Sequence, residues 1–216
     1  LYNGNISETH WKTSTDNILR KYTYDYDSMH RLKNAVYTLP DVVLPVVNSY
    51  DESLKYDKNG NIKALKRNGN LDAVNPAVTI DDLVYDYEAN SNKLIKVTDN
   101  PSTATSGFLD GANLANEYFY DSTQGNLIVD KNKGIQSITY NHLNLPTKII
   151  FSSGNYIDYL YTASGTKVAK TVKEGSIITN TDYLDVFQYK KVGAGATLLE
   201  FLPHKEGYVS GIDYKY

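Results

Sequence analysis

Acidic side chains recur in this chain at positions where they could bind a cation. Four of the acids that directly follow a tyrosine are themselves followed by polar turn-forming residues: Asp27, Asp57, Glu88 and Asp121. Carboxylates aligned along one edge of a sheet would offer the oxygen ligands that calcium prefers. Residues 57–61 are similar to a calcium-binding loop, but their glycine stands at the fourth position instead of the sixth. Because aspartate also accepts backbone hydrogen bonds in tight turns, we expect turn formation and no metal site.

The remaining residues with reactive side chains do not form a catalytic arrangement. The four histidines, at positions 10, 30, 142 and 204, lack the spacing of metal ligands. The glycine-rich stretch 193–196 lacks the lysine and hydroxyl of a phosphate-binding loop, so it predicts a hairpin tip. Cysteine is absent, which excludes a thiolate nucleophile. We therefore expect no enzyme and no cofactor. A catalytic site within segments 40–49 or 101–115 is the alternative, although neither segment groups acids, bases and nucleophiles.

The tyrosine–acid pairs belong to a phrase that repeats along the chain. The phrase consists of a tyrosine, an acid or amide, several polar turn formers and an aliphatic residue. The residues that define its copies are Tyr26, Asp27 and Leu32; Tyr56, Asp57, Gly60, Asn61 and Ile62; Tyr87 and Leu94; Tyr120, Asp121, Gly125, Asn126 and Leu127; Tyr140; and Tyr161 and Gly165. A clipped copy occupies residues 2–6. Such recurrence, at steps of roughly 20 to 35 residues, predicts a repeat architecture in which each unit packs against its neighbours.

The residues around each phrase predict β-strands. Tyr22, Tyr24 and Tyr26 recur at a period of two, which places their side chains on one face of a strand. The chain has 20 tyrosines against 5 phenylalanines and 1 tryptophan, and aromatic residues of this kind favour strands. Asn–Gly and Gly–Asn pairs after the tyrosines supply the positive φ that hairpin turns need. The sequence therefore predicts an all-β fold of antiparallel hairpins.

The phrase resembles the YD repeat of the RHS family, which reads Tyr-Asp-x-x-Gly and then Asn or Arg before an aliphatic residue. The copy at 56–62 matches at every position, whereas His30 replaces the glycine of the first full copy, and Asn141 and Thr162 replace the aspartate of the last two. Residues 90–94 and 201–209 are similar to RHS proteins of Bacteroidetes-type bacteria. The resemblance implies tandem hairpins in a curved, spiralling sheet, part of a hollow β-shell around a C-terminal cargo that is often a toxin. Teneurins and insecticidal toxin complexes carry similar shells.

This resemblance also sets the expected role of the chain. It implies a single non-catalytic repeat region over residues 1–216, a fragment of a longer secreted or cell-surface protein whose partner is the cargo domain of the same polypeptide. In RHS proteins the self-cleaving activity lies after the repeats, and its Asp-Pro-x-Gly motif is absent here. A formal net charge of −3 predicts no nucleic-acid surface. The most apolar run, 42–47, is too short to span a membrane.

Two further expectations concern surfaces. An exposed row such as Tyr22, Tyr24 and Tyr26 could stack on sugar rings, so a carbohydrate-binding or adhesin module at the cell surface is the alternative function. Packing against the next repeat is the simpler role, because each copy keeps its tyrosine in the same position. End strands, expected near residues 2–7 and 208–216, would expose unpaired backbone groups, so we also expect self-association of the chain.

Overall fold

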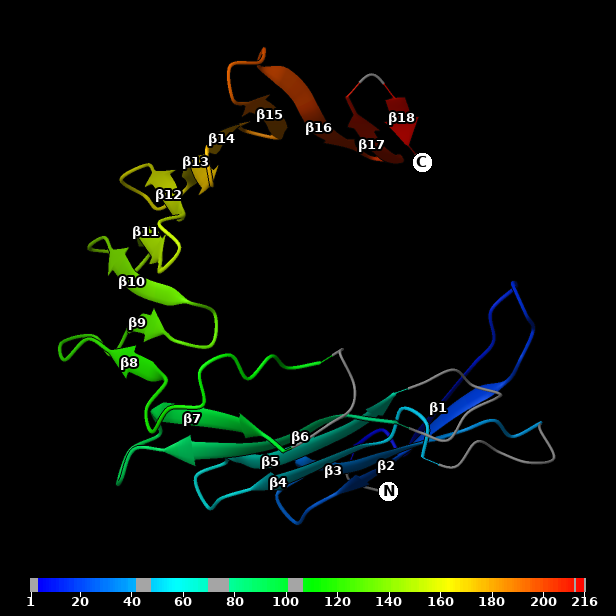
Figure 1. Cartoon of the computed structure of the whole chain (residues 1–216). Coiled ribbons are helices and arrows are strands. Elements are labelled where there is room, and N and C mark those ends of the chain that lie inside the picture. Colours follow the sequence, from blue (N-terminus) through cyan, green and yellow to red (C-terminus); the bar gives the residue numbers. More distant parts are fainter. Residues whose placement is uncertain (1–3, 42–47, 70–77, 101–106, 212, 216) are drawn as a thin grey trace. The chain divides into compact units, whose positions relative to one another are not determined.

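The structure is a computed structural model that describes residues 4–41, 48–69, 78–100, 107–211 and 213–215. Over these ranges the chain forms strands, turns and loops without a helix, and thus no helix that could cross a membrane. The chain divides into two compact units, Leu1–Asn116 and Glu117–Tyr216, and each unit holds one antiparallel sheet (Figure 1). The predicted all-β fold of antiparallel hairpins is confirmed. That the two units act as a single repeat region stays a prediction.

Unit 1 contains a seven-stranded sheet in which strands follow one another in sequence order. Its strands are β1 (Glu8–Trp11), β2 (Arg20–Tyr26), β3 (Leu32–Thr38), β4 (Glu52–Tyr56), β5 (Ile62–Gly69), β6 (Val78–Tyr87) and β7 (Leu94–Asp99). Among the described residues the first strand begins at Glu8, and residues 4–7, part of the end strand expected near 2–7, lie before it. The chain before it is still attached to the sheet, because the backbone N–H of Tyr24 donates to the carbonyl of Ser7 at 2.9 Å.

Unit 2 contains an eleven-stranded sheet, again in sequence order. Its strands are β8 (Tyr118–Tyr120), β9 (Leu127–Asp130), β10 (Ile135–Tyr140), β11 (Pro146–Phe151), β12 (Tyr156–Tyr161), β13 (Lys167–Glu174), β14 (Ile177–Leu184), β15 (Phe187–Val192), β16 (Leu198–His204), β17 (Gly207–Ser210) and β18 (Asp213–Lys215). Every connection links neighbouring antiparallel strands, so each sheet is a simple meander of hairpins.

The apolar core of unit 1 lies on the face of the sheet that carries the phrase tyrosines, which we call the tyrosine face. Paired residues of antiparallel strands share a face, and Tyr22 pairs with Tyr37 while Tyr24 pairs with Ala35. Tyr37 is only 3% exposed. The other buried apolar residues of unit 1 are Ala35, Leu39, Leu83 and Val97. In the described part of unit 2 the corresponding residue is Ile138, and most side chains of β11 to β15 are half-buried.

An aromatic cluster extends this core in unit 1. Trp11 stacks on Tyr22 with ring centroids 5.7 Å apart, and Tyr22 stacks on Tyr24 at 5.9 Å. The rings of Tyr37 and Tyr50 meet edge to face, with their centroids 5.2 Å apart. The hydroxyl of Tyr22 donates to the carbonyl of Tyr50, and burial raises the pKa of Tyr22 to about 12. The expected tyrosine row therefore packs within its own unit.

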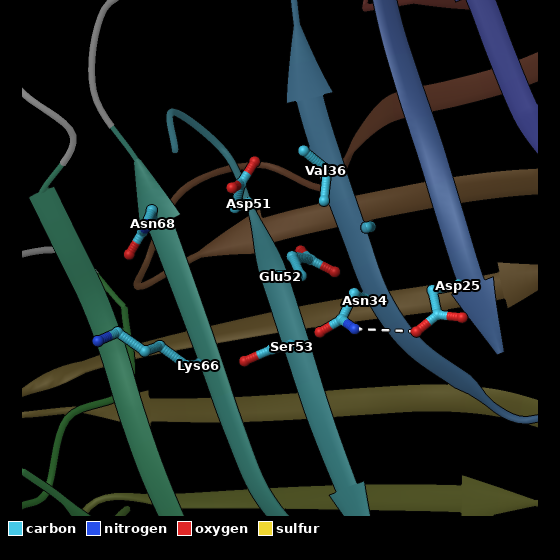
Figure 2. Close-up of a pocket in the computed structure, with 9 residues that line it drawn as sticks. Asp25, Asn34, Val36, Asp51, Glu52, Ser53, Lys66 and Asn68 are labelled. Atoms are coloured by element: carbon cyan, nitrogen blue, oxygen red, sulfur yellow. Dashed lines mark hydrogen bonds between the residues drawn. The ribbon is translucent and has the colours of Figure 1, made fainter. Parts of the chain in front are cut away.

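A pocket of 290 Å³ opens where β3 and β4 separate (Figure 2). These strands pair through only two residue pairs, Asn34 with Ser53 and Ala35 with Glu52. Beyond them Asp51 takes the place of a backbone partner, because its Oδ1 accepts the N–H of Tyr37 at 2.8 Å. Burial raises the pKa of the Asp51 carboxyl above its ordinary value. The pocket thus lies where the two strands diverge, and the Asp51 carboxylate replaces the missing backbone partner of Tyr37.

Candidate functional site: repeat turns and tyrosine clasps

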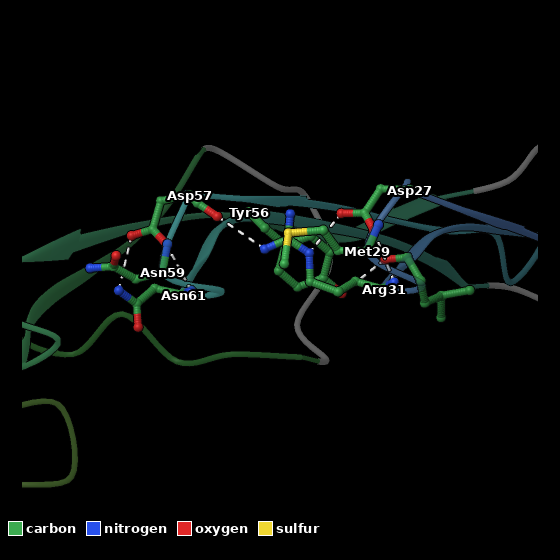
Figure 3. A network of polar contacts seen from close by, with 8 residues as sticks. Asp27, Met29, Arg31, Tyr56, Asp57, Asn59 and Asn61 are labelled. Carbon is green, nitrogen blue, oxygen red and sulfur yellow. Dashed lines mark hydrogen bonds and ion pairs between the residues drawn. The ribbon is translucent and has the colours of Figure 1, made fainter.

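The phrase beginning at Tyr56 forms a compact turn organised by its aspartate. Oδ1 of Asp57 accepts the backbone N–H groups of Asn59 and Asn61, each at 2.9 Å (Figure 3). The N–H of Asp57 donates to the carbonyl of Asn61 at 2.9 Å, and the N–H of Gly60 donates to the carbonyl of Asp57 at 3.2 Å. Gly60 has a φ of 94°, which a residue without Cβ adopts at little cost. Acid and glycine thus perform separate tasks in one turn.

The same acceptor role recurs at the other phrase aspartates. Oδ1 of Asp27 accepts the backbone N–H groups of Met29 and Arg31, each at 2.9 Å. In the longer turn, the carboxylate of Asp121 accepts four backbone N–H groups. The backbone N–H of Arg31 is the largest cause that lowers the pKa of Asp27, and the N–H of Gln124 is the largest for Asp121. The three phrase aspartates are thus accounted for as turn acceptors.

Copies that depart from the phrase keep the same turn. His30, in place of glycine, has a φ of 63°. The amide oxygen of Asn141 accepts the backbone N–H groups two and four residues later, at 2.9 and 3.1 Å. Oγ1 of Thr162 accepts the N–H of Thr166 at 3.1 Å. Amide and hydroxyl oxygens can replace a carboxylate here because the turn needs only one well-placed acceptor.

In the phrase that begins at Tyr87 a serine supplies this acceptor. The N–H of Glu88 donates to the carbonyl of Lys93 at 2.9 Å, which closes the longer turn. Oγ of Ser91 accepts the N–H of Lys93 at 3.1 Å, while the side chain of Glu88 is exposed. The acid of this copy is therefore not the turn acceptor that its position suggested.

A further turn of this type was not predicted from the sequence. The N–H of Phe151 donates to the carbonyl of Asn155, and the N–H of Gly154 donates to the carbonyl of Phe151, both at 2.9 Å. The turn joins β11 to β12, between two phrase turns, and lacks the tyrosine–acid pair. Its only sequence signal is the Gly154–Asn155 pair, which matches the end of the phrase.

Each phrase tyrosine also lies opposite a β-bulge in the returning strand. Lys55 pairs with Ala64 but Tyr56 pairs with Ile62, so the returning strand contains one extra residue, Lys63. The same register shift directly precedes all six phrase tyrosines. A bulge increases local twist and re-aims the neighbouring side chains. The bulge is therefore a regular part of the repeat.

Four of the phrase tyrosines, Tyr26, Tyr56, Tyr87 and Tyr140, connect consecutive hairpins through a contact that we call the tyrosine clasp. The hydroxyl of Tyr56 donates to the carbonyl of Leu32, the residue that pairs with the preceding phrase tyrosine, at 2.8 Å. Equivalent bonds run from Tyr26 to Ile6, from Tyr87 to Ile62 and from Tyr140 to Leu127, at 2.9, 2.9 and 2.6 Å. Burial raises the pKa of Tyr56 and of Tyr140. Each clasp ties a hairpin to the one before it.

Cations cover two of the clasping rings. The guanidinium carbon of Arg31 lies 4.6 Å from the ring centroid of Tyr56, and Nζ of Lys63 lies 5.2 Å from that of Tyr87. Arg31 also donates from Nε to Oδ2 of Asp27 at 2.6 Å and from Nη1 to the carbonyl of Asp57 at 3.0 Å (Figure 3). One arginine thus bridges two successive turns and occupies a ring face that a sugar would need.

Asparagine side chains add direct bonds between turns. Nδ2 of Asn61 donates to Oδ1 of Asn92 at 2.8 Å, and Asn59 donates to the same oxygen at 3.1 Å. In unit 2, Nδ2 of Asn126 donates to Oδ1 of Asn144 at 2.9 Å. The Asn of the Gly–Asn phrase therefore contacts the next turn in the row.

The segments considered as a separate catalytic site act as packing elements where they are described. Oδ1 of Asp81, a fully buried carboxylate in β6, accepts the N–H of Phe108 at 2.6 Å. Oδ2 of Asp81 accepts from Nε of Arg67 at 2.6 Å. Oδ2 of Asp110 accepts the N–H of Asp99 at 3.2 Å. Segment 107–110 is thereby attached to β6 and β7, while residues 42–47 and 101–106 lie outside the described ranges.

The remaining sequence candidates are dispersed. His10, His30 and His142 are exposed, and Nδ1 of His204 accepts the N–H of Glu206 at 3.2 Å. Residues 193–196 lie in the loop between β15 and β16, as the hairpin-tip prediction placed them. Within the described residues, no group of three or more histidine or acidic side chains has a geometry that could hold a metal ion.

Solved structures share this fold, whereas no protein-family model and no curated protein sequence matches the chain. The crystal structure of TcdB2-TccC3-Cdc42 aligns with a TM-score of 0.56 and 10% identity over 94% of this chain and 12% of that chain. The structure of TcdB2-TccC3 without hypervariable C-terminal region aligns with a TM-score of 0.57 and 12% identity, again over 94% and 12%. The chain thus spans about an eighth of these solved chains. At such identities the likeness shows the fold alone.

Proposed function

We propose that this chain is a non-catalytic structural module that forms part of a β-shell around a C-terminal toxin or effector cargo of the same polypeptide. The observation that carries the proposal is the tyrosine clasp, which ties consecutive hairpins together at the same position. A contact that repeats in this way can be extended by adding hairpins, which suits a wall better than a single pocket. The shared fold with TcdB2-TccC3 supports the same role.

The comparison also supports the proposed setting. One of the similar structures is described as TcdB2-TccC3 without hypervariable C-terminal region, so that protein has such a region when complete. A wall module followed by a variable region is the arrangement that the proposal requires. We therefore place this chain in a secreted or cell-surface RHS-type protein whose cargo follows the repeats.

Protease protection in the native polypeptide tests the enclosure. Limited proteolysis followed by mass spectrometry should cut the region beyond residue 216 more slowly than the exposed loops of the repeat region. A variant that carries Tyr56→Phe and Tyr87→Phe should lose part of this protection, because two clasps are removed. Tyr24→Phe serves as the matched control, since its hydroxyl has no hydrogen-bond partner among the described residues. Cutting of the downstream region at loop rates in the unmodified protein would refute enclosure.

The proposal also predicts an inert chain. The purified 216-residue chain should show no nuclease, protease or glycosidase turnover, and its expression should not harm bacteria. Reproducible turnover that disappears when one aspartate or glutamate is replaced by its amide would establish a catalytic role instead.

A further inference from the structure

A polar groove of 420 Å³ crosses four strands on the tyrosine face of unit 2. Tyr159 of β12 pairs with Lys170 of β13, which fixes the face on which Lys170 lies. Lys170 pairs with Thr181 of β14, and Thr181 pairs with Lys190 of β15. All three residues line the groove, together with the amide of Gln188. Lys170, Thr181 and Lys190 therefore place three hydrogen-bond donors on one level of the sheet, and Gln188 lies two residues away from Lys190 on the same strand.

The two lysines of this level differ in their partners. Nζ of Lys190 lies 2.7 Å from Oε1 of Glu200 in β16, so this ammonium is neutralised within the sheet. Among the described residues Lys170 has no acidic partner, and Glu174, four positions further along β13, has no basic partner. At roughly 3.3 Å per residue, Glu174 is about 13 Å from Lys170 along the strand, too far for an ion pair. The groove thus has one positive charge without an ion-pair partner at Lys170 and one such negative charge about 13 Å away at Glu174.

The groove also offers a hydroxyl next to the charge of Lys170. Thr181 is 5% exposed, and within the described ranges its hydroxyl makes no hydrogen bond. Adjacent strands lie about 4.8 Å apart, so the backbone of Thr181 is that far from Lys170 on one side and from Lys190 on the other. A carboxylate above Thr181 could accept from the hydroxyl and from the ammonium of Lys170 together.

On the tyrosine face of unit 1 an ion pair has all its partners within the chain. Arg67 and Asp81 pair across β5 and β6 on that face, and the backbone of Phe108 adds a third partner. Those charges are satisfied within the chain. The charge at Lys170 is not, and complementarity with an acidic group is the arrangement that would satisfy it.

We propose that the Lys170–Thr181–Lys190 row binds an acidic, extended segment of the enclosed cargo, with a carboxylate held by Lys170 and Thr181. This inference rests on the proposed function, because it assigns the tyrosine face of unit 2 to the side that meets the cargo. It goes beyond the proposed function by naming the surface that contacts the cargo, the tyrosine face of unit 2, and the chemical group that this surface binds, a carboxylate.

Peptide binding to the 216-residue chain tests the inference. The probe is a short fluorescent peptide in which glutamate alternates with serine, and the comparison peptide has glutamine in place of glutamate. Fluorescence anisotropy should show saturable binding of the glutamate peptide only, with affinity that falls as salt is added. Lys170→Gln should weaken binding about tenfold, the size expected for loss of a charged hydrogen-bond partner.

Lys191→Gln is the matched control variant. Lys191 follows Lys190 in β15 but pairs with Asn180, so its side chain lies on the opposite face of the same strand. The control removes the same charge and should leave binding unchanged, while Thr181→Val should weaken it with the charge kept. Denaturation midpoints of all variants establish that they fold.

Two results would overturn the inference. Equal affinity for the glutamate and glutamine peptides would exclude carboxylate recognition. Equal losses in Lys170→Gln and Lys191→Gln would mean attraction by overall charge without a site. Either result would leave protease protection of the native polypeptide intact, so failure of this inference is distinguishable from failure of the proposed function.

Discussion

The clasp hydroxyl of Tyr56 can be removed with almost no change in shape. In Tyr56→Phe the ring and the Arg31 guanidinium above it stay, but the carbonyl of Leu32 loses the donor that lies 2.8 Å away. A net hydrogen bond is worth about 0.5–1.5 kcal/mol, so we expect a loss of about 1 kcal/mol in the free energy of unfolding. Tyr56→Ala would cost about 3–5 kcal/mol for a fully buried ring. This ring is half-buried, so we expect about 2–3 kcal/mol.

Urea denaturation followed by tyrosine and tryptophan fluorescence measures these losses. With a slope of about 1–3 kcal/mol per molar urea, the Tyr56→Phe midpoint should fall by roughly 0.3–1 M. Tyr24→Phe controls for the loss of a hydroxyl on the same face of unit 1, and its midpoint should stay close to that of the unmodified chain. Coincident midpoints for Tyr56→Phe and Tyr24→Phe would refute the view that the clasp bond stabilises the sheet.

Three other predictions follow from the turns and the attached segment. His30→Gly should raise the free energy of unfolding by about 0.5–1 kcal/mol in the same assay, because His30 has a positive φ of 63°. Hydrogen bonds lower the folded-state pKa of Asp27 and Asp57, so their stabilisation is complete above the unfolded pKa of about 4 and is lost as pH falls below it. Asp57→Ala should flatten this acid-side loss in denaturation midpoints measured across pH. Gly107→Ala should destabilise far more than Gly125→Ala, because the new Cβ would lie 2.5 Å from a buried carboxylate oxygen at the first position and in open space at the second. Thermal unfolding compares these two variants.

The turns were predictable because their cause is local. An acceptor at the second position of the phrase and a residue tolerant of positive φ near its end are both visible in the sequence, as Asp57 and Gly60 show. The tolerance of the turn for His30 was less evident, because it follows from the whole set of turn bonds. The sequence could place the hairpins but not the acceptor of each tyrosine, since the carbonyl of Leu32 carries no side-chain signal.

Other features depend on contacts between residues far apart in the chain. Neither the bulge opposite each phrase tyrosine nor the burial of Asp81 leaves a pattern in the sequence, because both arise from the pairing register. Asp81 reads as one of two neighbouring acids in a strand, and only the approach of Phe108 makes it a buried acceptor. The alternation of strand residues shows which side chains share a face, whereas it does not show what covers that face.

After Tyr161 several turns between strands become shorter, and the polar groove lies on strands that these shorter turns connect. From β13 onward several hairpins have two-residue turns: Glu174 pairs with Ile177, and Leu184 pairs with Phe187. A two-residue turn fixes the register of its strands by its own geometry. A longer phrase turn does not, so the side-chain acceptor and the bulge set the register there, joined by the clasp where one is present. Where the turn itself fixes the register, no tyrosine ring is needed on the tyrosine face at each hairpin. Polar residues such as Lys170 can therefore occupy these positions on that face. The polar groove therefore begins where two-residue turns replace the phrase turns.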